Sequence, residues 1–477
     1  MLPSELARQN WGRRRSKISA HPTSLPRATP PALSIEQAEL PPLEFTPRRR
    51  LVGLDVMRGL AIFAVVCGHL QFRIHDSPWG QGFWLHARQV ALVGVDVFLV
   101  LSGFLIGGML LSELRDTGRV AFGRFFARRA WRLLPVFVVT TLLGWYWSRH
   151  FKWEDEGTFI KGSPLSHLWP YATFTVNYYN LIKHDFGAAA TLQAWTLCVI
   201  VHFYIILAII VAGIAAVGRR IGVRRAVRVV PWLVAATFAM ALASRWHNAP
   251  AATYKYDPYS NYFETHLRID ECMFGVLLAY WAVFCRPAFE RVIRVLAWPL
   301  IAIAVGMYGF MMFRSGEAPR WLVIWGYTSA GVVSGGLIAV LWWWEQRSRQ
   351  GLAKAAPAAL AVVARPVLVA IGWVGIWSYA IYLSHQPLVE KTLSIKGESL
   401  IARHLLSWKS PYLFTASMIA YVGMAIAFGA LLYFIVELPG RMLRDRWLAP
   451  RRAKSDSRAA GMESPFVTAS AAAPTAP

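Results

Sequence analysis

Apolar runs long enough to cross a lipid bilayer recur in this chain from Leu51 to Trp447, and they restrict its fold more than any other feature. Of its 477 residues, 56% are hydrophobic and 16% are charged, and the mean hydropathy is +0.39. Such a composition is typical of a polytopic membrane protein. We therefore expect an all-α bundle of transmembrane helices.

At about twenty residues per span, the apolar runs predict about ten transmembrane helices. The expected spans are residues 51–70, 91–111, 133–148, 191–217, 230–245, 263–285, 296–313, 321–344, 367–385 and 411–436.

The net charge of +24 is concentrated in short segments next to these spans. Because Lys and Arg accumulate in cytoplasmic loops, the pattern predicts that both termini are cytoplasmic. Nucleic-acid binding would need a basic face on a folded soluble domain, and the sequence offers no such domain. The basic clusters precede the first span and follow every even-numbered one, at residues 48–50, 115–132, 219–228, 286–294, 347–354 and 441–446.

The chain is predicted to contain one folded domain, residues 47–447, in the membrane. Residues 1–46 are basic and rich in Pro, residues 448–477 are rich in Ala, Ser and Pro, and both segments are predicted to be disordered. The first segment lacks a signal-peptide core, so we expect the first span to be a retained anchor. No loop has room for a second catalytic domain.

Common cofactor motifs are missing from the sequence. The cysteines, Cys67, Cys198, Cys272 and Cys285, fall within predicted spans and have no zinc-ligand spacing, so we expect them to pack as small apolar side chains. The phosphate-binding loop, the dinucleotide-binding turn and the zinc-protease helix motif are also missing. We expect no bound metal or cofactor, and any chemistry should take place within the membrane segments.

Arg58 and His69 are ionisable residues inside the first apolar run. Eleven residues of helix place both side chains on one face, about 16 Å apart along the axis. Such residues usually face a bundle interior or a wet cavity and indicate a pathway or a catalytic site. The alternative is an arginine that extends to the lipid headgroups and a histidine that is satisfied by a backbone carbonyl.

Two further segments place polar residues near the outer membrane level. The sixth span begins with Glu264, His266, Arg268 and Asp270, and the ninth ends with Tyr382 and His385. In the predicted orientation His69, Asp270 and His385 lie at one level, where neighbouring helices could combine them for acid–base chemistry. Alternatively, these residues simply meet the headgroups at the ends of spans.

A basic segment precedes the third span. Arg124, Arg128, Arg129 and Arg132 are spaced for one cationic helix surface that suits a phosphate ligand. Stop-transfer charge with contact to anionic lipid is the alternative interpretation.

These segments together resemble membrane acyltransferase family 3, whose members are O-acyltransferases of envelope glycans. The resemblance extends over most of the chain, with six motifs in the family's order. The motifs are Leu54-Asp55-Val-Met-Arg58-Gly59-Leu-Ala with His69, Gly94-Val-Asp96-Val-Phe98-Leu-Val-Leu-Ser102-Gly103-Phe104-Leu-Ile, Arg128-Arg129-Ala-Trp-Arg132-Leu-Leu-Pro135, Arg268-Ile-Asp270 with Gly275, Ser378-Tyr379-Ala-Ile-Tyr382-Leu-Ser-His385-Gln-Pro387 and Glu437-Leu-Pro439.

The fourth span departs from the family pattern. Trp195-Thr196-Leu197 keeps the family's frame, but Ile200 and Val201 stand where a pair of glutamates is common, and His202 follows. The departure indicates a divergent subfamily in which His202, Glu264 or Asp270 could replace the missing acids.

The resemblance implies an integral membrane O-acyltransferase with acyl-CoA, expected to be acetyl-CoA, as donor. Arg128, Arg129 and Arg132 would bind the donor's phosphates, and Arg58 would be a catalytic residue that lines the acyl path. His69 would act as general base or carry the acyl group transiently.

The remaining roles that the resemblance suggests lie on the outer side. Asp270 would be a further catalytic residue, and Arg268, Tyr382 and His385 would bind the acceptor. The acceptor would be a hydroxyl of an envelope polysaccharide or glycolipid at the outer face of a bacterial inner membrane, and no metal would be needed.

Two other functions also agree with the sequence. One is a transporter or flippase of a lipid-linked substrate that uses the polar residues as a pathway. The other is a catalytically silent relative in a glycan-assembly complex, which the replacement by Ile200 and Val201 motivates.

Overall fold

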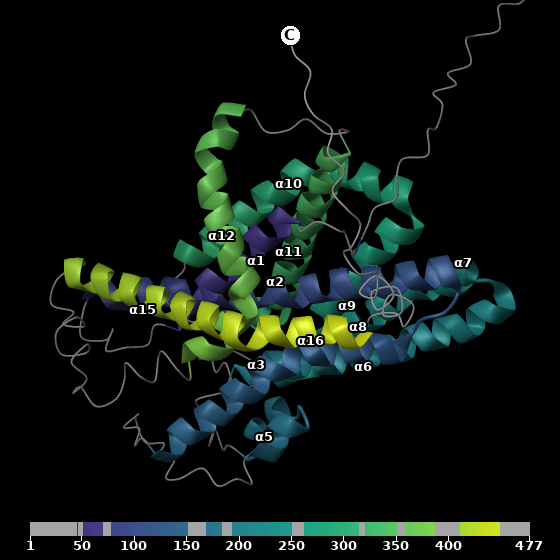
Figure 1. Cartoon of the computed structure of the whole chain (residues 1–477). Coiled ribbons are helices and arrows are strands. Elements are labelled where there is room, and N and C mark those ends of the chain that lie inside the picture. Colours follow the sequence, from purple (N-terminus) through teal and green to yellow (C-terminus); the bar gives the residue numbers. More distant parts are fainter. Residues whose placement is uncertain are drawn as a thin grey trace, which may run out of the picture. The chain divides into compact units, whose positions relative to one another are not determined.

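The computed structural model describes residues 45, 51–69, 78–150, 168–183, 193–249, 262–313, 320–350, 358–386 and 411–448. These residues form helices joined by turns, with no strand among them, which confirms the all-α class (Figure 1). The helices are α1 (Val52–Gly68), α2 (Pro78–Thr117), α3 (Phe122–His150), α4 (Trp169–Ala172), α5 (Val176–Lys183), α6 (Ala194–Ile221), α7 (Val223–Ala226), η4 (Val227–Val229), α8 (Val230–Asn248), α9 (Thr265–Phe284), α10 (Arg286–Phe313), α11 (Arg320–Arg349), α12 (Ala358–Ser384), α15 (Pro411–Leu432), η6 (Tyr433–Glu437) and α16 (Leu438–Leu448).

Several of these helices are long and apolar enough to cross a membrane, so the chain is a multi-pass integral membrane protein. The described part of the chain contains six such segments, or seven if α9 and the start of α10, between which the chain bends by 119°, are counted as one span. The six are Val93–Thr117, Ala194–Ile221, Val223–Asn248, Ile324–Arg349, Pro366–Ser384 and Met418–Leu448.

The predicted number of ten spans is not confirmed. The predicted spans 51–70 and 133–148 lie in α1, which has only 17 residues, and in α3, whose first turns hold the basic motif. The predicted seventh span, 296–313, lies inside α10, the partner of α9 in the bent pair. The predicted orientation of the termini stays a prediction, and the segments predicted to be disordered lie almost wholly outside the described residues.

Helix α2 is central to the packing and contacts α1, α6, α9, α10 and α11. Two glycines allow its close approach to α9. A Cβ atom at Gly103 would overlap the carbonyl of Cys272, and one at Gly275 would overlap the carbonyl of Val100. Small residues at such crossings let backbones meet closely, as in other membrane helix pairs.

The start of α1 is fixed by a residue distant in sequence. The backbone N–H groups of Val52 and Gly53 each donate to the Glu345 carboxylate of α11, at 2.8 Å. A carboxylate at this position satisfies unpaired amides and stabilises the positive end of the helix dipole. Further along α1, Gly59 packs against the backbone of Ile371 of α12. These contacts hold α1, which carries Arg58, against α11 and α12.

Candidate active site

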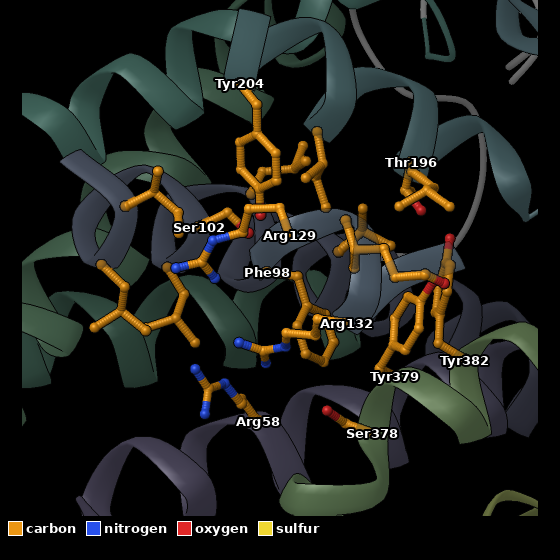
Figure 2. A pocket seen from close by; sticks show the side chains of 18 of the residues that line it. Arg58, Phe98, Ser102, Arg129, Arg132, Thr196, Tyr204, Ser378, Tyr379 and Tyr382 are labelled. Carbon is orange, nitrogen blue, oxygen red and sulfur yellow. The ribbon is translucent and has the colours of Figure 1, made fainter. Parts of the chain in front are cut away.

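A cavity of about 330 Å³ lies between α1, α2, α3, α6 and α12. Its two sides differ in chemistry. Figure 2 shows the guanidinium groups of Arg58, Arg129 and Arg132 gathered on one side, and the side chains of Tyr379 and Tyr382 on the other. The walls between the two sides are mainly apolar and include Phe98, Leu101, Leu105, Ile106, Leu133 and Ile200.

The cationic side brings two sequence motifs together. Arg129 and Arg132, three residues apart on α3, line the cavity, as does Arg58 from α1. Helical spacing explains the selection, because residues three apart share a face and adjacent ones do not. Arg128 is exposed and does not line the cavity. The structure therefore brings together two of the three arginines predicted to bind the donor.

Cations exceed carboxylates on this side of the cavity. Arg58 forms a 2.9 Å ion pair with Asp55, but neither Arg129 nor Arg132 has an ion-pair partner among the described residues. Arg129 instead contacts the Met109 sulfur at 3.6 Å and lies over the Phe125 ring. Burial lowers the pKa of Arg129 to about 10, so it remains cationic near neutral pH. This side of the cavity is suited to an anion.

Two histidines predicted at the same membrane level meet in the structure. The His69 and His385 rings lie edge to face, with centroids 5.0 Å apart. Nδ1 of His69 donates to the Val65 carbonyl at 2.8 Å, and Nδ1 of His385 donates to the Tyr382 carbonyl at 2.7 Å. Since a carbonyl can only accept, each neutral ring holds its lone pair on Nε2. That tautomer is the one a general base at Nε2 requires.

Tyr382 connects the histidines to the cavity. Its ring lines the cavity and lies 5.8 Å, centroid to centroid, from the ring of His385. His385 is fully buried, and its Nε2 has no hydrogen-bond partner in the described part of the chain. The predicted site residues Arg58, Tyr382, His385 and His69 thus form a connected group with Arg129 and Arg132.

Asp270 and Arg268 belong to a second cluster, between α2, α8, α9 and α11. One Asp270 oxygen accepts from Arg245 at 2.7 Å, and the other accepts from Thr328 at 2.7 Å. Arg268 pairs with Asp96 and with Glu271, the latter at 2.9 Å.

This second cluster has the features of a structural ion network. All five charged side chains are at most 1% exposed, and each forms an ion pair with another member of the cluster. The structure does not bring Asp270 to the histidine pair, and Arg268 does not line the cavity. The catalytic role of Asp270 and the acceptor-binding role of Arg268 remain predictions without a supporting contact.

The sequence-based prediction does not include some residues of the cavity and of the ion network. Ser102, Thr196 and Tyr379 line the cavity, and each lies in a motif whose helical face could have been used to find it. Arg245 and Thr328 stand outside every motif and become partners of Asp270 only through the packing of α8 and α11. No sequence signal identifies that pairing.

The two positions at which the family commonly has glutamates, and the histidine that follows them, face different parts of the structure. Ile200 lines the cavity, whereas Val201 packs in a separate apolar cluster with residues such as Val136 and Leu197. His202 is turned toward α9, where its Nδ1 lies 2.7 Å from the Thr265 hydroxyl. None of the three places a carboxylate in the cavity.

Comparison with known proteins gives one family and several distant relatives. The family model described as an acyltransferase domain matches residues 51–434. A Staphylococcus aureus protein (strain COL) named "Putative O-acetyltransferase" is 23% identical over 401 residues, which are 82% of this chain and 58% of that protein. A Listeria monocytogenes protein named peptidoglycan O-acetyltransferase is 28% identical over 161 residues, 33% of this chain and 24% of that protein.

The match to these relatives is partial. This chain spans a little over half of the Staphylococcus aureus protein, at 58%. No solved structure gives a significant match to the chain.

Proposed function

The chain belongs to the acyltransferase family whose domain model it matches over residues 51–434, and from that membership we propose that it is an integral membrane O-acyltransferase. It moves an acyl group, expected to be acetyl, from cytoplasmic acyl-CoA to a hydroxyl of an envelope polysaccharide or glycolipid. The observation that carries the proposal is one cavity. At one side it has Arg129 and Arg132, neither with an ion-pair partner among the described residues, and at the other a tyrosine in contact with a histidine pair.

The donor fits the cationic side of this cavity. The phosphates of CoA would bind Arg129 and Arg132, since guanidinium groups form strong charge-assisted hydrogen bonds to phosphate. The thioester arm would then extend between the apolar walls toward Tyr382, with Arg58 along its path. In the predicted orientation α3 begins in the cytoplasm, where acyl-CoA is available.

The transfer needs one base and no oxidant. Nε2 of His69 would take the proton of the acceptor hydroxyl while its oxygen attacks the thioester carbonyl. The carbon–sulfur bond then breaks, and the CoA thiolate leaves and receives a proton. The ring of His385 contacts both the His69 ring and the Tyr382 ring, and it would hold the His69 ring in place.

The test compares ester-linked acyl groups on the envelope glycans of the host by mass spectrometry. A deletion strain would be complemented with wild type or His69→Ala, at matched protein level. We expect wild type to restore the esters and His69→Ala to reduce their rate of formation by about 10²–10⁴-fold, the usual contribution of a general base.

The other two functions predict different results. A transporter would move its substrate across a bilayer without acyl-CoA, and a silent relative would leave the esters unaffected by deletion. Esters that do not depend on the protein would contradict the proposed acyltransferase, and Ile200 would then be the first position to examine.

A further inference from the structure

A further polar cluster, distinct from both the cavity and the ion network of Asp270, lies where the α4–α5 segment meets the N-terminal parts of α6 and α9. We call it the α5–α9 cluster. Its members are Asn177, Tyr178, His202, Glu264, Thr265 and His266.

Hydrogen bonds join three helices in the α5–α9 cluster. The Asn177 amide nitrogen of α5 donates to the Thr265 hydroxyl of α9 at 3.1 Å, and the same hydroxyl lies 2.7 Å from Nδ1 of His202 on α6. The Tyr178 hydroxyl lies 3.2 Å from Nδ1 of His266, and the two rings are stacked. The cluster is therefore an ordered arrangement and not a set of loose surface groups.

Two oxygen atoms of the cluster have no hydrogen-bond donor in the described part of the chain. Asn177 is 2% exposed, and its Oδ1 has no hydrogen-bond partner among the described residues; the same is true of Oε2 of Glu264. Because the Asn177 nitrogen is anchored to Thr265, its amide oxygen also lies within the cluster. A buried acceptor without a donor destabilises a fold, so its presence suggests that a ligand supplies the donor.

The chemistry of the cluster differs from that of the cavity. The cavity presents arginines, whereas the α5–α9 cluster contains no Arg or Lys and presents a carboxylate, an amide oxygen and imidazoles. Such a set repels phosphate and matches a neutral ligand that donates hydrogen bonds, such as the hydroxyls of a sugar. Trp169 on α4 is 51% exposed and offers an aromatic face on the same segment.

The N-terminal part of α6 contacts both the α5–α9 cluster and the active site. Thr196 of α6 lines the cavity, Gln193 donates to the Leu383 carbonyl two residues before His385, and His202 faces the α5–α9 cluster. We infer that the α5–α9 cluster binds sugar hydroxyls of the acceptor glycan, so that an extended glycan lies across the start of α6 and reaches the histidine pair. This inference rests on the proposed acyltransferase function.

The experiment uses the full chain in the deletion strain and two readouts. One is the amount of ester-linked acyl groups on envelope glycans, and the other is the binding of CoA to the purified chain in lipid nanodiscs. The variants are Glu264→Leu, which removes the buried acceptor, and His266→Phe, which keeps the stacked ring but removes its nitrogens. His247→Phe, at an exposed histidine on α8, is the matched control.

We expect both cluster variants to reduce the amount of esters at least tenfold and to bind CoA with an affinity within about twofold of wild type. The control variant should match wild type in both readouts. Glu264→Leu should also raise the melting temperature, since an apolar side chain replaces an unpaired buried acceptor. A lower melting temperature with weaker CoA binding would identify a structural cluster and overturn the inference, as would unchanged esters. Absence of esters in wild type would instead contradict the proposed function, and the inference with it.

Discussion

The cavity and the buried ion network both place arginines inside an apolar helical protein, yet they differ in charge balance. In the network, Arg245 and Arg268 are fully buried and face Asp96, Asp270 and Glu271. In the cavity, Arg58 has one carboxylate partner, while Arg129 and Arg132 have no ion pair among the described residues. In the closed network each arginine has at least one carboxylate partner, whereas the cavity holds accessible arginines in excess of carboxylates and suits an anionic ligand.

The largest expected effect follows from breaking the network. Asp270→Asn would leave Arg245 without its carboxylate partner in a fully buried position. Loss of one member of a buried pair typically destabilises a protein by about 3–5 kcal/mol. Thermal unfolding in detergent should show this loss, while the fraction that remains folded binds CoA with unchanged affinity.

Acyl transfer by the same variant shows whether the ion network is separate from the active site. If Asp270→Asn folds as stably as wild type but loses acyl transfer, Asp270 is a catalytic residue after all and the network belongs to the active site. Asp445→Asn, at an exposed carboxylate of α16 paired with Arg444, is the control, and it should change neither stability nor transfer.

The next largest effect concerns the donor. Arg132→Gln removes one guanidinium from the cavity without leaving a carboxylate unpaired among the described residues. A hydrogen bond to a charged group contributes about 1.5–3 kcal/mol, so CoA affinity should fall about 10- to 150-fold. Isothermal titration of the purified chain with CoA measures it, and an unchanged Kd would show that the donor binds elsewhere.

A change of opposite sign should come from Asp55. Asp55→Asn removes the carboxylate beside Arg58 and makes the cavity more positive. Because this pair is partly exposed and such pairs contribute about 0.2–1 kcal/mol, CoA should bind up to about fivefold more tightly. The same kind of substitution thus weakens the protein in the network and strengthens ligand binding in the cavity. Weaker CoA binding by Asp55→Asn would contradict this view of the cavity.

The smallest effect is expected at Arg128, which lies next to Arg129 in sequence but is exposed and outside the cavity. An exposed charge contributes little in water, so Arg128→Gln should change CoA affinity by no more than about twofold. Both Arg128→Gln and Arg132→Gln remove one positive charge, so a difference in their CoA affinity reports the position of that charge. Equal losses in the two variants would favour general attraction by the basic segment.

The amino-acid sequence is enough to predict the class of fold and most side chains of the candidate active site. Apolar runs predict membrane helices because a helix satisfies its own backbone hydrogen bonds in lipid. Helical periodicity places Arg129 and Arg132 on one face, and the family motifs name Arg58, His69, Tyr382 and His385.

Which of these residues meet depends on how the helices pack. Neighbours along one helix follow from its period, but contacts between helices depend on their crossings, such as that of Gly103 with Cys272. Those crossings bring His69 to His385 and turn Asp270 to Arg245 and Thr328, although the sequence predicts similar depths for all three residues. The reason is that depth fixes one coordinate, whereas packing fixes the other two.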